Sequence, residues 1–364
     1  MGILHRVYAR HAAAIWEVET RLLHRLGRVR APVAVQWLVT AACELTCPHC
    51  YSRAGRRGAD ELTTAEAKAR VIDELVALGC EDIVLAGGEL FLRKDLPELI
   101  AYLSDRGIRW ALHSHGRLVP RFRELLARHT PVMAAISVDG PEALHDGFRG
   151  RAGSFREALR AIEVLKEVGC PEVIVGTTVT RANADHVAAM LPDVLGSAAD
   201  GWGLHLFAPE GRGAEHRALF PTDGQLARVA AFARRARAFT RVELDNEWGS
   251  AGADDAHYRD TPFLCGAGRI TCVVGPTGEV MPCTTTDPAE SAGNVREHRL
   301  SDLWRRGFEK FRQPGDASCA DGRECWLQSR NGNACRHKAF GTAETRLGPI
   351  VTSPPRTPEP RRTA

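Results

Sequence analysis

The sequence predicts an α/β fold whose parallel sheet is either open or curled into a partial barrel. Helical periodicity alternates with short apolar strands over residues 33–238, and glycines at Gly79 and Gly169 end two of the helices. Two junctions, 78–85 and 168–175, repeat one order of helix end, glycine, cysteine and strand. Because strand–helix–strand units join parallel strands by right-handed crossovers, six strands that are each followed by a helix predict this fold.

The individual elements follow from local signals. Short apolar runs bounded by polar or glycine residues predict strands at 33–40, 83–86, 109–113, 132–138, 172–178 and 202–207. Segments with helical spacing, the first capped by Thr63 or Thr64, predict helices at 63–78, 95–105, 120–129, 154–168, 184–196 and 223–238. In parallel folds the chemistry lies at the C-terminal ends of the strands, so the residues after each strand are candidates for a site.

Composition excludes several classes of protein. The chain of 364 residues is 44% hydrophobic and 26% charged, as in ordinary globular proteins. Its net charge of +3 is spread without a basic stripe, which argues against a nucleic-acid partner. The sequence has no apolar run long enough for a membrane span and no signal-peptide core, so we expect a cytoplasmic protein without membrane contact. Eleven cysteines in such a protein favour metal or redox chemistry over disulfides.

Four segments are expected along the chain. Residues 1–30 predict an amphipathic helix that packs on the body of the protein, and 31–245 hold the alternating strands and helices. A second, cysteine-rich region follows at 246–340. Residues 341–364 are rich in proline and arginine and predict a disordered tail.

Three cysteines lie within eight residues of one another after the first predicted strand. Cys43, Cys47 and Cys50 are spaced so that their thiolates can take three corners of an iron–sulfur cubane. Such clusters normally have four cysteine ligands, so the fourth iron would be open to a small molecule. Spacing alone also leaves open a zinc site, of which Cys-x2-Cys is the common half.

The other strand ends carry glycines and polar side chains that would lie on the same edge. A Gly-Gly pair lets the backbone approach a ligand closely, and a neighbouring carboxylate can accept hydrogen bonds from an ammonium group. These strand-end residues are Gly87, Gly88, Glu89, His113, His115, Ser137, Asp139, Thr178, Asn183, His205 and Arg212.

Over residues 33–210 the chain resembles the radical S-adenosylmethionine (SAM) superfamily. The resemblance rests on Cys43-x3-Cys47-x2-Cys50 after the first strand and Gly87-Gly88-Glu89 after the second. It implies a (β/α)6 partial TIM barrel with a 4Fe–4S cluster on the three cysteines. By the same resemblance, the amino and carboxylate groups of SAM chelate the open iron.

The resemblance also implies roles for residues around SAM. Gly87, Gly88 and Glu89 would hold the methionine amino group. Ser137 and Asp139 match the Ser-x-Asp-Gly that lies near the ligand, and His49 stands where many members place an aromatic residue against the adenine. Leu90 departs from the proline that often follows Gly-Gly-Glu in the family.

The second cysteine group begins with a predicted β-hairpin. A Gly-Pro-x-Gly turn at 275–278 would bring Cys272 and Cys283 together, and a helix is expected from Leu300 to about Phe311. A zinc ribbon is one interpretation of this pattern. The group as a whole is Cys265, Cys272, Cys283, Cys319, Cys325 and Cys335.

This region resembles the SPASM/twitch extension of radical SAM enzymes. The resemblance implies one fully ligated auxiliary 4Fe–4S cluster on Cys265, Cys272, Cys283 and Cys335. The second auxiliary cluster is expected to be lost, because Gly322 and Asn331 stand where two of its cysteines are expected. Cys319 and Cys325 are left as ligands of a rearranged second cluster.

The resemblance implies reductive cleavage of SAM to a 5′-deoxyadenosyl radical, which removes a hydrogen atom from the substrate. The auxiliary cluster would then accept an electron from the substrate radical. His113, His115 and His205 are candidates to deprotonate the substrate and Arg212 to clamp a substrate carboxylate, although each also fits a packing or hydrogen-bonding role.

SPASM-bearing relatives commonly modify ribosomally made peptides by cross-links, thioethers, epimerisation or oxidation, so a peptide is the expected substrate. Oxidation or rearrangement of a small molecule of aminosugar or tetrapyrrole type is the alternative, and a non-catalytic metal-binding protein is the third hypothesis. A flavodoxin- or ferredoxin-type electron donor is expected as a partner. The segment 1–30 is shorter than a leader-peptide-binding domain, so a separate protein would supply that function.

Overall fold

The structure, a computed structural model, describes residues 31–249, 256–260, 266–286 and 288–312, together with Leu22 and Leu26. Leu26 N donates a helical hydrogen bond of 3.1 Å to Leu22 O, and both side chains are exposed. The rest of the predicted N-terminal helix and the predicted tail lie outside the described residues.

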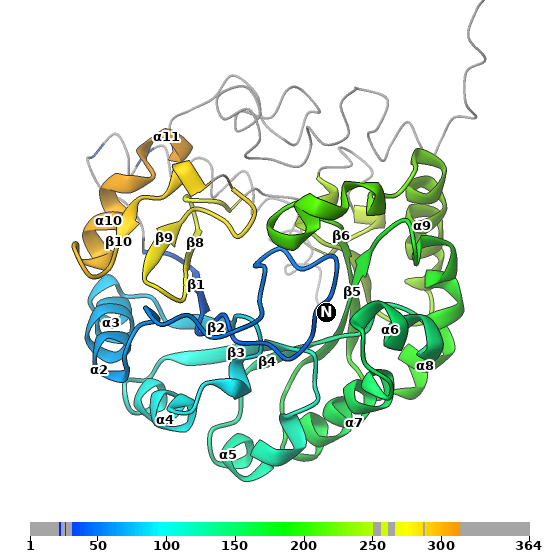
Figure 1. The fold of residues 1–364 in the computed structure, drawn as a ribbon, viewed down its shortest axis with the longest axis horizontal. Coiled ribbons are helices and arrows are strands. Elements are labelled where there is room, and N and C mark those ends of the chain that lie inside the picture. The colour runs from blue at the N-terminus through cyan, green and yellow to red at the C-terminus, as the bar shows by residue number, and fades with distance from the viewer. Residues whose placement is uncertain are drawn as a thin grey trace, which may run out of the picture.

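A single curved sheet organises the described chain (Figure 1). Its strand order is β10-β9-β8-β1-β2-β3-β4-β5-β6-β7, and β1 to β7 run parallel in sequence order. The parallel strands are β1 (Ala34–Leu38), β2 (Asp82–Ala86), β3 (Arg109–Ser114), β4 (Met133–Ser137), β5 (Val173–Val179), β6 (Gly201–Leu206) and β7 (Val242–Leu244). The partial barrel predicted from the sequence is confirmed.

Helices line the outside of the curved sheet (Figure 1). The α-helices are α2 (Thr64–Glu66), α3 (Asp73–Leu78), α4 (Leu96–Asp105), α5 (Arg123–Arg128), α6 (Glu142–Arg149), α7 (Ser154–Glu167), α8 (Leu191–Gly196), α9 (Asp223–Ala236), α10 (Leu300–Gly307) and α11 (Glu309–Arg312). A π-helical segment, η1 (Ala67–Ile72), joins α2 to α3. The 3-10 segments are η2 (Leu90–Leu92), η3 (Val119–Phe122), η4 (Ala184–Met190), η5 (Gly211–Leu219), η6 (Asn246–Trp248) and η8 (Pro288–Glu290).

Local signals fixed these elements where they were strong. Thr63 forms a capping box with Glu66 at the start of α2, and Gly79 ends α3 in the left-handed conformation at φ 72°. Cys80 and Cys170 are buried at the entrances of β2 and β5, and each Sγ lies 3.3 Å from a carbonyl two residues on. Both cysteines of the repeated junctions therefore pack as small buried residues in the core.

Two elements of the barrel were not predicted from the sequence. α6 contains Gly147 and only two large apolar residues, Leu144 and Phe148, so its helical signal is weak. β7 has three residues, fewer than a period-two pattern needs. α6 and the segment just after β7 supply residues to the site described below.

The hydrophobic core lies between the sheet and the helices. Val35 and Trp37 alternate along β1 and are fully buried in one cluster with helix residues such as Leu75 of α3. The alternate residues of β1, Ala34, Gln36 and Leu38, are partly exposed and face the other side of the sheet, which is the barrel interior. The interior face is therefore free to carry polar side chains.

The C-terminal region extends the same sheet. β8 (Thr271–Val274) pairs parallel with β1, while β9 (Glu279–Met281) and β10 (Gly293–Asn294) continue antiparallel, so the predicted hairpin is confirmed. Glu74 of α3 accepts hydrogen bonds from Arg299 Nε at 2.9 Å and Ser301 N at 3.1 Å. The expected boundary near residue 245 is thus crossed by continuous hydrogen bonding.

Among the described residues, no helix combines the length and the apolar character that a membrane crossing requires.

Candidate functional site at the mouth of the barrel

The cysteine loop leaves β1 and is closed by its own backbone. Cys43 N donates to Gly55 O at 2.7 Å, and Gly55 N donates to Ala41 O at 2.9 Å. Cys50 N donates to Cys47 O at 3.3 Å. These hydrogen bonds hold the ends of the loop together.

Arg212, from η5 on the opposite side of the barrel, fastens the loop. Its N donates to Cys50 O at 2.8 Å, its Nη1 to Cys47 O at 2.9 Å, and its Nη2 to Ala54 O. The guanidinium is thus engaged by carbonyls of the chain itself. This arrangement agrees with the hydrogen-bonding role expected for Arg212, and a clamp on a substrate carboxylate stays a prediction.

The three sulfurs have the surroundings that cluster thiolates require. Cys43, Cys47 and Cys50 are free thiols. Leu45 N lies 3.5 Å from Cys43 Sγ, and Ala54 N lies 3.4 Å from Cys50 Sγ. The Nη1 of Arg149 lies 3.9 Å from Cys47 Sγ. Because N–H donors to sulfur stabilise ligating thiolates, this loop fits a 4Fe–4S cluster.

Gly87 and Gly88 bring the end of β2 against the segment that leads into the loop. Gly88 N donates to Thr40 O at 2.8 Å, and Glu89 N donates to Ala42 O at 2.7 Å. A Cβ on Gly87, whose φ is +144°, would lie 2.5 Å from Thr40 O, and one on Gly88 would lie 2.2 Å from Ala42 O. Glycine is therefore required here for backbone contact, before any ligand is considered.

Gly88→Ala is expected to lower the free energy of unfolding by about 1–3 kcal/mol, because its Cβ must displace rigid backbone. Urea denaturation measures this loss. Gly147→Ala is the matched control, since nothing lies within 4 Å of the added Cβ in α6, and it should leave stability unchanged or higher. Equal stability of the two variants would contradict the steric argument.

Glu89 is a fully buried carboxylate tied to the residues after β3. It accepts hydrogen bonds from Ser114 Oγ at 2.8 Å and from His115 N and Phe91 N at 3.3 Å. The His115 Nε2 lies 3.1 Å from Glu89 and 3.5 Å from Glu44, as ion-pair contacts without directional hydrogen-bond geometry. Glu89 is thus fully engaged by its own neighbours, and a contact of its carboxylate with SAM stays a prediction.

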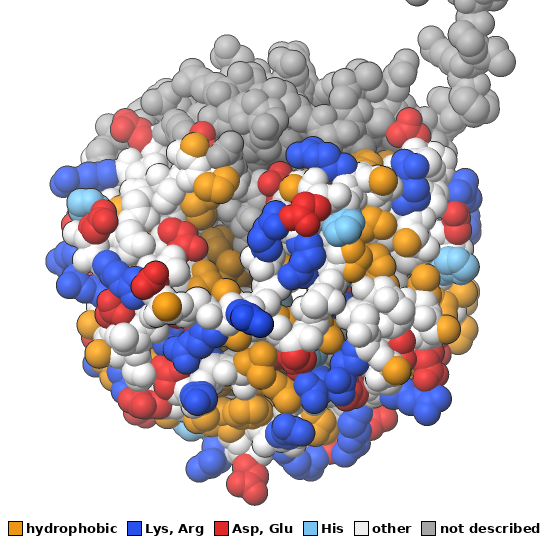
Figure 2. All heavy atoms as spheres, in the orientation of Figure 1, with side chains coloured by type: hydrophobic (Ala, Val, Ile, Leu, Met, Phe, Trp, Pro, Cys, Tyr) orange, Lys and Arg blue, Asp and Glu red, His pale blue; other side chains and the backbone are white. Residues whose placement is uncertain are grey.

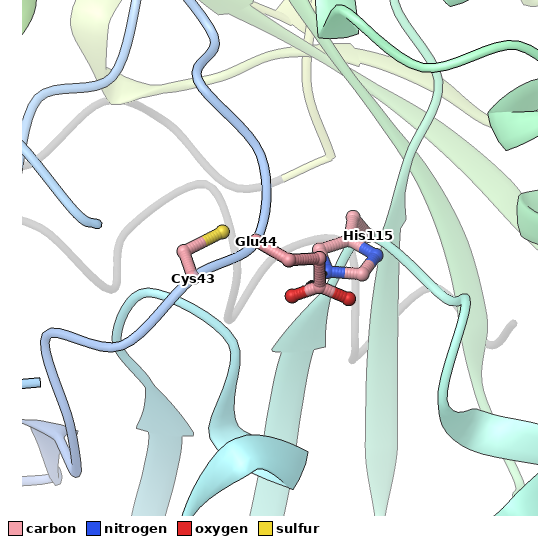
Figure 3. A group of neighbouring side chains, drawn as sticks. All are labelled: Cys43, Glu44 and His115. Atoms are coloured by element: carbon pink, nitrogen blue, oxygen red, sulfur yellow. Dashed lines mark ion pairs between the residues drawn. The ribbon is translucent and has the colours of Figure 1, made fainter. Parts of the chain in front are cut away.

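Figure 3 shows His115 beside Glu44 and Cys43. Burial alone would lower the pKa of His115, but the Glu89 carboxylate, followed by the nearby Cys43 and Glu44, raises it to about 10. The imidazole is therefore a cation at neutral pH, enclosed between the cysteine loop and the Gly-Gly-Glu segment. This placement favours a positioning role over the expected role as a base toward substrate.

Asp139 and Arg149 form a buried ion pair behind Cys47. Asp139 is fully buried, with Arg149 Nε at 2.7 Å from its Oδ2 and Thr178 N at 2.9 Å from its Oδ1. Burial would raise the pKa of Asp139, but Arg149 and then His49 lower it to about 2. Arg149 thus links Asp139 to a cluster thiolate. Arg149 was not identified from the sequence because α6 was not predicted. An arginine ten residues after Asp139 could have indicated a partner for that carboxylate.

His49 lies in the same region. Its ring stacks on Phe148 of α6 with centroids 4.7 Å apart, and its Nε2 lies 3.7 Å from Asp139. Burial lowers the pKa of His49 to about 4, and among the described residues its Nδ1 has no hydrogen-bond partner. Ser137 ends β4 half-buried, opposite Gly176 of β5. The predicted contacts of His49, Ser137 and Asp139 with SAM stay predictions.

His113 and His205 lie in a second polar group inside the barrel. His205 Nδ1 lies 3.0 Å from Asp245 Oδ2 and 3.4 Å from Glu247 Oε2. Although burial opposes it, these carboxylates hold the pKa of His205 well above its usual value. Burial, reinforced by the charge of His205, lowers the pKa of His113 to about 4. Asp245 and Glu247 were missed because β7 was not predicted.

The two hairpin cysteines that are described have different surroundings. Cys272 is fully buried in the core, in register with Val35 of β1, and burial raises the pKa of its thiol. Cys283 is half-buried, and its Sγ lies 3.5 Å from Thr285 Oγ1. Burial, followed by the charges of Cys50, Glu247 and Cys283, raises the pKa of Tyr51, the residue after Cys50. Cys265, Cys319, Cys325 and Cys335 lie outside the described residues, so the ligands of the auxiliary cluster stay a prediction.

The mouth of the barrel gathers these groups around a hollow. In the orientation of Figure 1, Figure 2 shows hydrophobic side chains in the hollowed centre of this face, with acidic and basic side chains around them. A cofactor or substrate at this end of the strands would meet both kinds of surface.

Comparisons with known proteins agree with this geometry. Residues 37–191 match the model of the radical SAM superfamily, and residues 265–326 match that of the SPASM iron–sulfur cluster-binding domain. The chain is 33% identical to an AdoMet-dependent heme synthase of Oleidesulfovibrio alaskensis, over 88% of this chain and 87% of that protein. It is 31% identical to the mycofactocin maturase MftC of Mycolicibacterium smegmatis, over 82% of this chain and 78% of that protein.

Among solved structures, the fold is similar to that of Streptococcus suis SuiB bound to its precursor peptide SuiA. The TM-score is 0.67 at 13% sequence identity, and the match covers 92% of this chain and 80% of SuiB.

Proposed function

Because the chain belongs to the radical SAM superfamily and carries a SPASM domain, we propose that it is a maturase that modifies a ribosomally synthesised peptide. The observation that carries this proposal is its 31% identity to a mycofactocin maturase over most of both chains. A fold shared with SuiB, which was solved with a bound precursor peptide, is compatible with it. The modification would be a cross-link, a thioether, an epimerisation or an oxidation.

The enzyme uses a 4Fe–4S cluster, SAM and auxiliary iron–sulfur clusters. When bound, these cofactors supply a 5′-deoxyadenosyl radical and a path for electrons. We assign Cys43, Cys47 and Cys50 to the SAM-binding cluster, with Gly87, Gly88 and the Ser137–Asp139 segment beside SAM. Cys265, Cys283 and Cys335, with Cys272 as the predicted fourth ligand, would hold one auxiliary cluster.

The chain's own residues would keep this site rigid. Arg212 holds the cysteine loop by its carbonyls, and Glu89 with His115 fixes the Gly-Gly segment against it. Arg149 places a positive charge beside Cys47, which favours its thiolate form. These contacts orient the cofactors and leave the hollow for the substrate.

Partners and location complete the proposal. A flavodoxin or ferredoxin would deliver the electron, and a separate protein would bind the leader of the peptide. A cytoplasmic location is proposed because free cluster cysteines need a reducing compartment.

A tetrapyrrole is the second candidate substrate. The 33% identity to a heme synthase supports it, and that match covers nearly nine-tenths of each chain. A modified porphyrin carboxylate or an oxidised ring would then be the product.

Mass spectrometry of the products separates the two substrates. The reconstituted enzyme, with dithionite and SAM, is incubated with a short peptide encoded beside its gene or, separately, with an iron porphyrin. We expect 5′-deoxyadenosine in both incubations and a changed product mass with the peptide alone. The incubations are repeated in D2O, because an epimerisation changes the peptide mass only through solvent deuterium placed on carbon. A changed porphyrin and an unchanged peptide would replace the first candidate by the second. If no 5′-deoxyadenosine formed in either incubation, the radical SAM assignment would be refuted.

A further inference from the structure

His205, Asp245 and Glu247 form a compact cluster at the C-terminal ends of two neighbouring strands. β6 and β7 pair with Leu204 opposite Leu244, so the residues that follow this pair in the chain, His205 of β6 and Asp245 just after β7, lie side by side. Glu247 follows in η6. The ligand atoms of the three side chains all lie within 4.8 Å of one another.

The backbone beneath this cluster is firmly held. Asp245 N donates to Leu204 O at 3.0 Å, and Trp248 Nε1 donates to the same carbonyl at 2.7 Å. Arg259, which is buried, donates to Leu244 O at 2.9 Å and to Gly249 O at 2.8 Å. These contacts fix β7 and η6 on both sides of the two carboxylates, so the cluster is preorganised.

The donor set suits a divalent metal ion. One imidazole nitrogen and two carboxylate oxygens carry two negative charges when the imidazole is neutral, and this mixture of nitrogen and oxygen is common around Mn²⁺, Fe²⁺ and Zn²⁺. Ligands bound to such an ion at about 2.1 Å lie roughly 3.0–3.4 Å apart in octahedral or tetrahedral geometry. The separations of His205 Nδ1 from Asp245 Oδ2 and Glu247 Oε2 are 3.0 and 3.4 Å.

An ion could also reach this cluster. The side chains of His205, Asp245 and Glu247 are 33%, 40% and 27% exposed. Gly176 and Gly203 lie beneath the His205 ring, where even an added Cβ would stay 3.6 Å from Nε2. A glycine on the neighbouring strand β5 and one on the His205 strand itself therefore leave the imidazole uncrowded.

We propose that His205 Nδ1, Asp245 Oδ2 and Glu247 Oε2 bind one divalent first-row metal cation at the barrel mouth, separate from the cysteine-bound clusters. The alternative is that the three side chains form only a charged hydrogen-bonded group around a protonated histidine. The two cases differ in whether the protein binds a metal ion, so they can be distinguished without knowing the substrate. Three protein ligands would leave positions for water or for an oxygen of a bound molecule.

Mn²⁺ is the probe, because free Mn²⁺ has a six-line EPR signal that decreases on binding. The cluster-loaded protein is washed with a chelator under conditions that preserve its cluster absorbance, and Mn²⁺ is then titrated. We expect one Mn²⁺ per chain, displaced by an equivalent of Zn²⁺. Asp245→Asn and Glu247→Gln should each weaken binding at least tenfold while the cluster absorbance and circular dichroism stay unchanged.

Asp193→Asn, an exposed carboxylate change in α8, is the matched control and should bind Mn²⁺ as the parent does. If Asp245→Asn does not fold, Glu247→Asp provides a second test of Mn²⁺ binding. Its shorter carboxylate should weaken the binding of Mn²⁺ without abolishing it. The proposal is overturned if the parent binds no Mn²⁺, or if Asp245→Asn and Glu247→Gln bind it as tightly as Asp193→Asn.

Discussion

Cys47→Ala is expected to abolish reductive cleavage of SAM. Removing a residue outside the ligand sphere costs a metal site about 10–100-fold in affinity or activity, so loss of one of three cysteine ligands should exceed about 100-fold. The Sγ of Cys47 also contacts the guanidinium of Arg149. The change therefore removes both a cluster ligand and the contact of its sulfur with a positive charge. The measurements are 5′-deoxyadenosine release under dithionite and iron per chain after anaerobic reconstitution.

Cys170→Ser is the matched control for that variant. Cys170 is also a buried thiol, but it lies at the entrance of β5, where its Sγ is 3.3 Å from the carbonyl oxygen of Glu172. We expect it to retain the iron content and SAM cleavage of the parent. If Cys47→Ala retained both as well, the assignment of the first cysteine loop to the SAM-binding cluster would be wrong.

Arg149→Met is expected to lower the free energy of unfolding by about 3–5 kcal/mol. The cost arises because Asp139, which is fully buried, would lose its arginine counter-charge and keep its own charge. Anaerobic urea denaturation followed by circular dichroism measures the loss. The same variant removes a positive charge near Cys47 Sγ, so the reduction potential of the cluster should fall, which an EPR redox titration detects.

The double variant Arg149→Met with Asp139→Asn tests the cause. Because it removes both charges, it should regain much of the stability that the single variant loses. Arg160→Met serves as a surface control, since the Arg160–Glu163 pair is exposed and its loss should change stability little. A double variant no more stable than Arg149→Met would show that the ion pair is not the source of the loss.

The sequence by itself predicted the barrel and its cysteine loop because both depend on local patterns. Gly79, Gly107 and Gly169 all adopt the positive φ that a glycine after a helix predicts. The spacing of Cys43, Cys47 and Cys50 is visible in the sequence without any tertiary contact. The same is true of the position of Gly87–Glu89 after the second strand. The hairpin was equally local, since its turn glycines lie between two short apolar runs.

Contacts between distant segments were decided only by the tertiary structure. Gly87 and Gly88 were expected to approach a ligand, yet their missing Cβ atoms first make room for Thr40 and Ala42. Arg212 was expected to face substrate, but its donors reach carbonyls more than 150 residues away in the chain. A sequence shows that a side chain can donate but does not show which acceptor lies within 3 Å.

The direction of a side chain also depends on register and on neighbouring strands. The cysteine spacing predicts Cys272 near Cys283 across the hairpin, and only the pairing of β8 with β1 shows that Cys272 also lies in the core beside Val35. His205 was identified as a strand-end residue, but its carboxylate partners, Asp245 and Glu247, come just after a strand of three residues that no periodicity could reveal. Local periodicity therefore determined the elements and the cluster loop, while strand pairing across the sheet decided which polar groups meet, because hydrogen bonding between distant strands leaves no local signal.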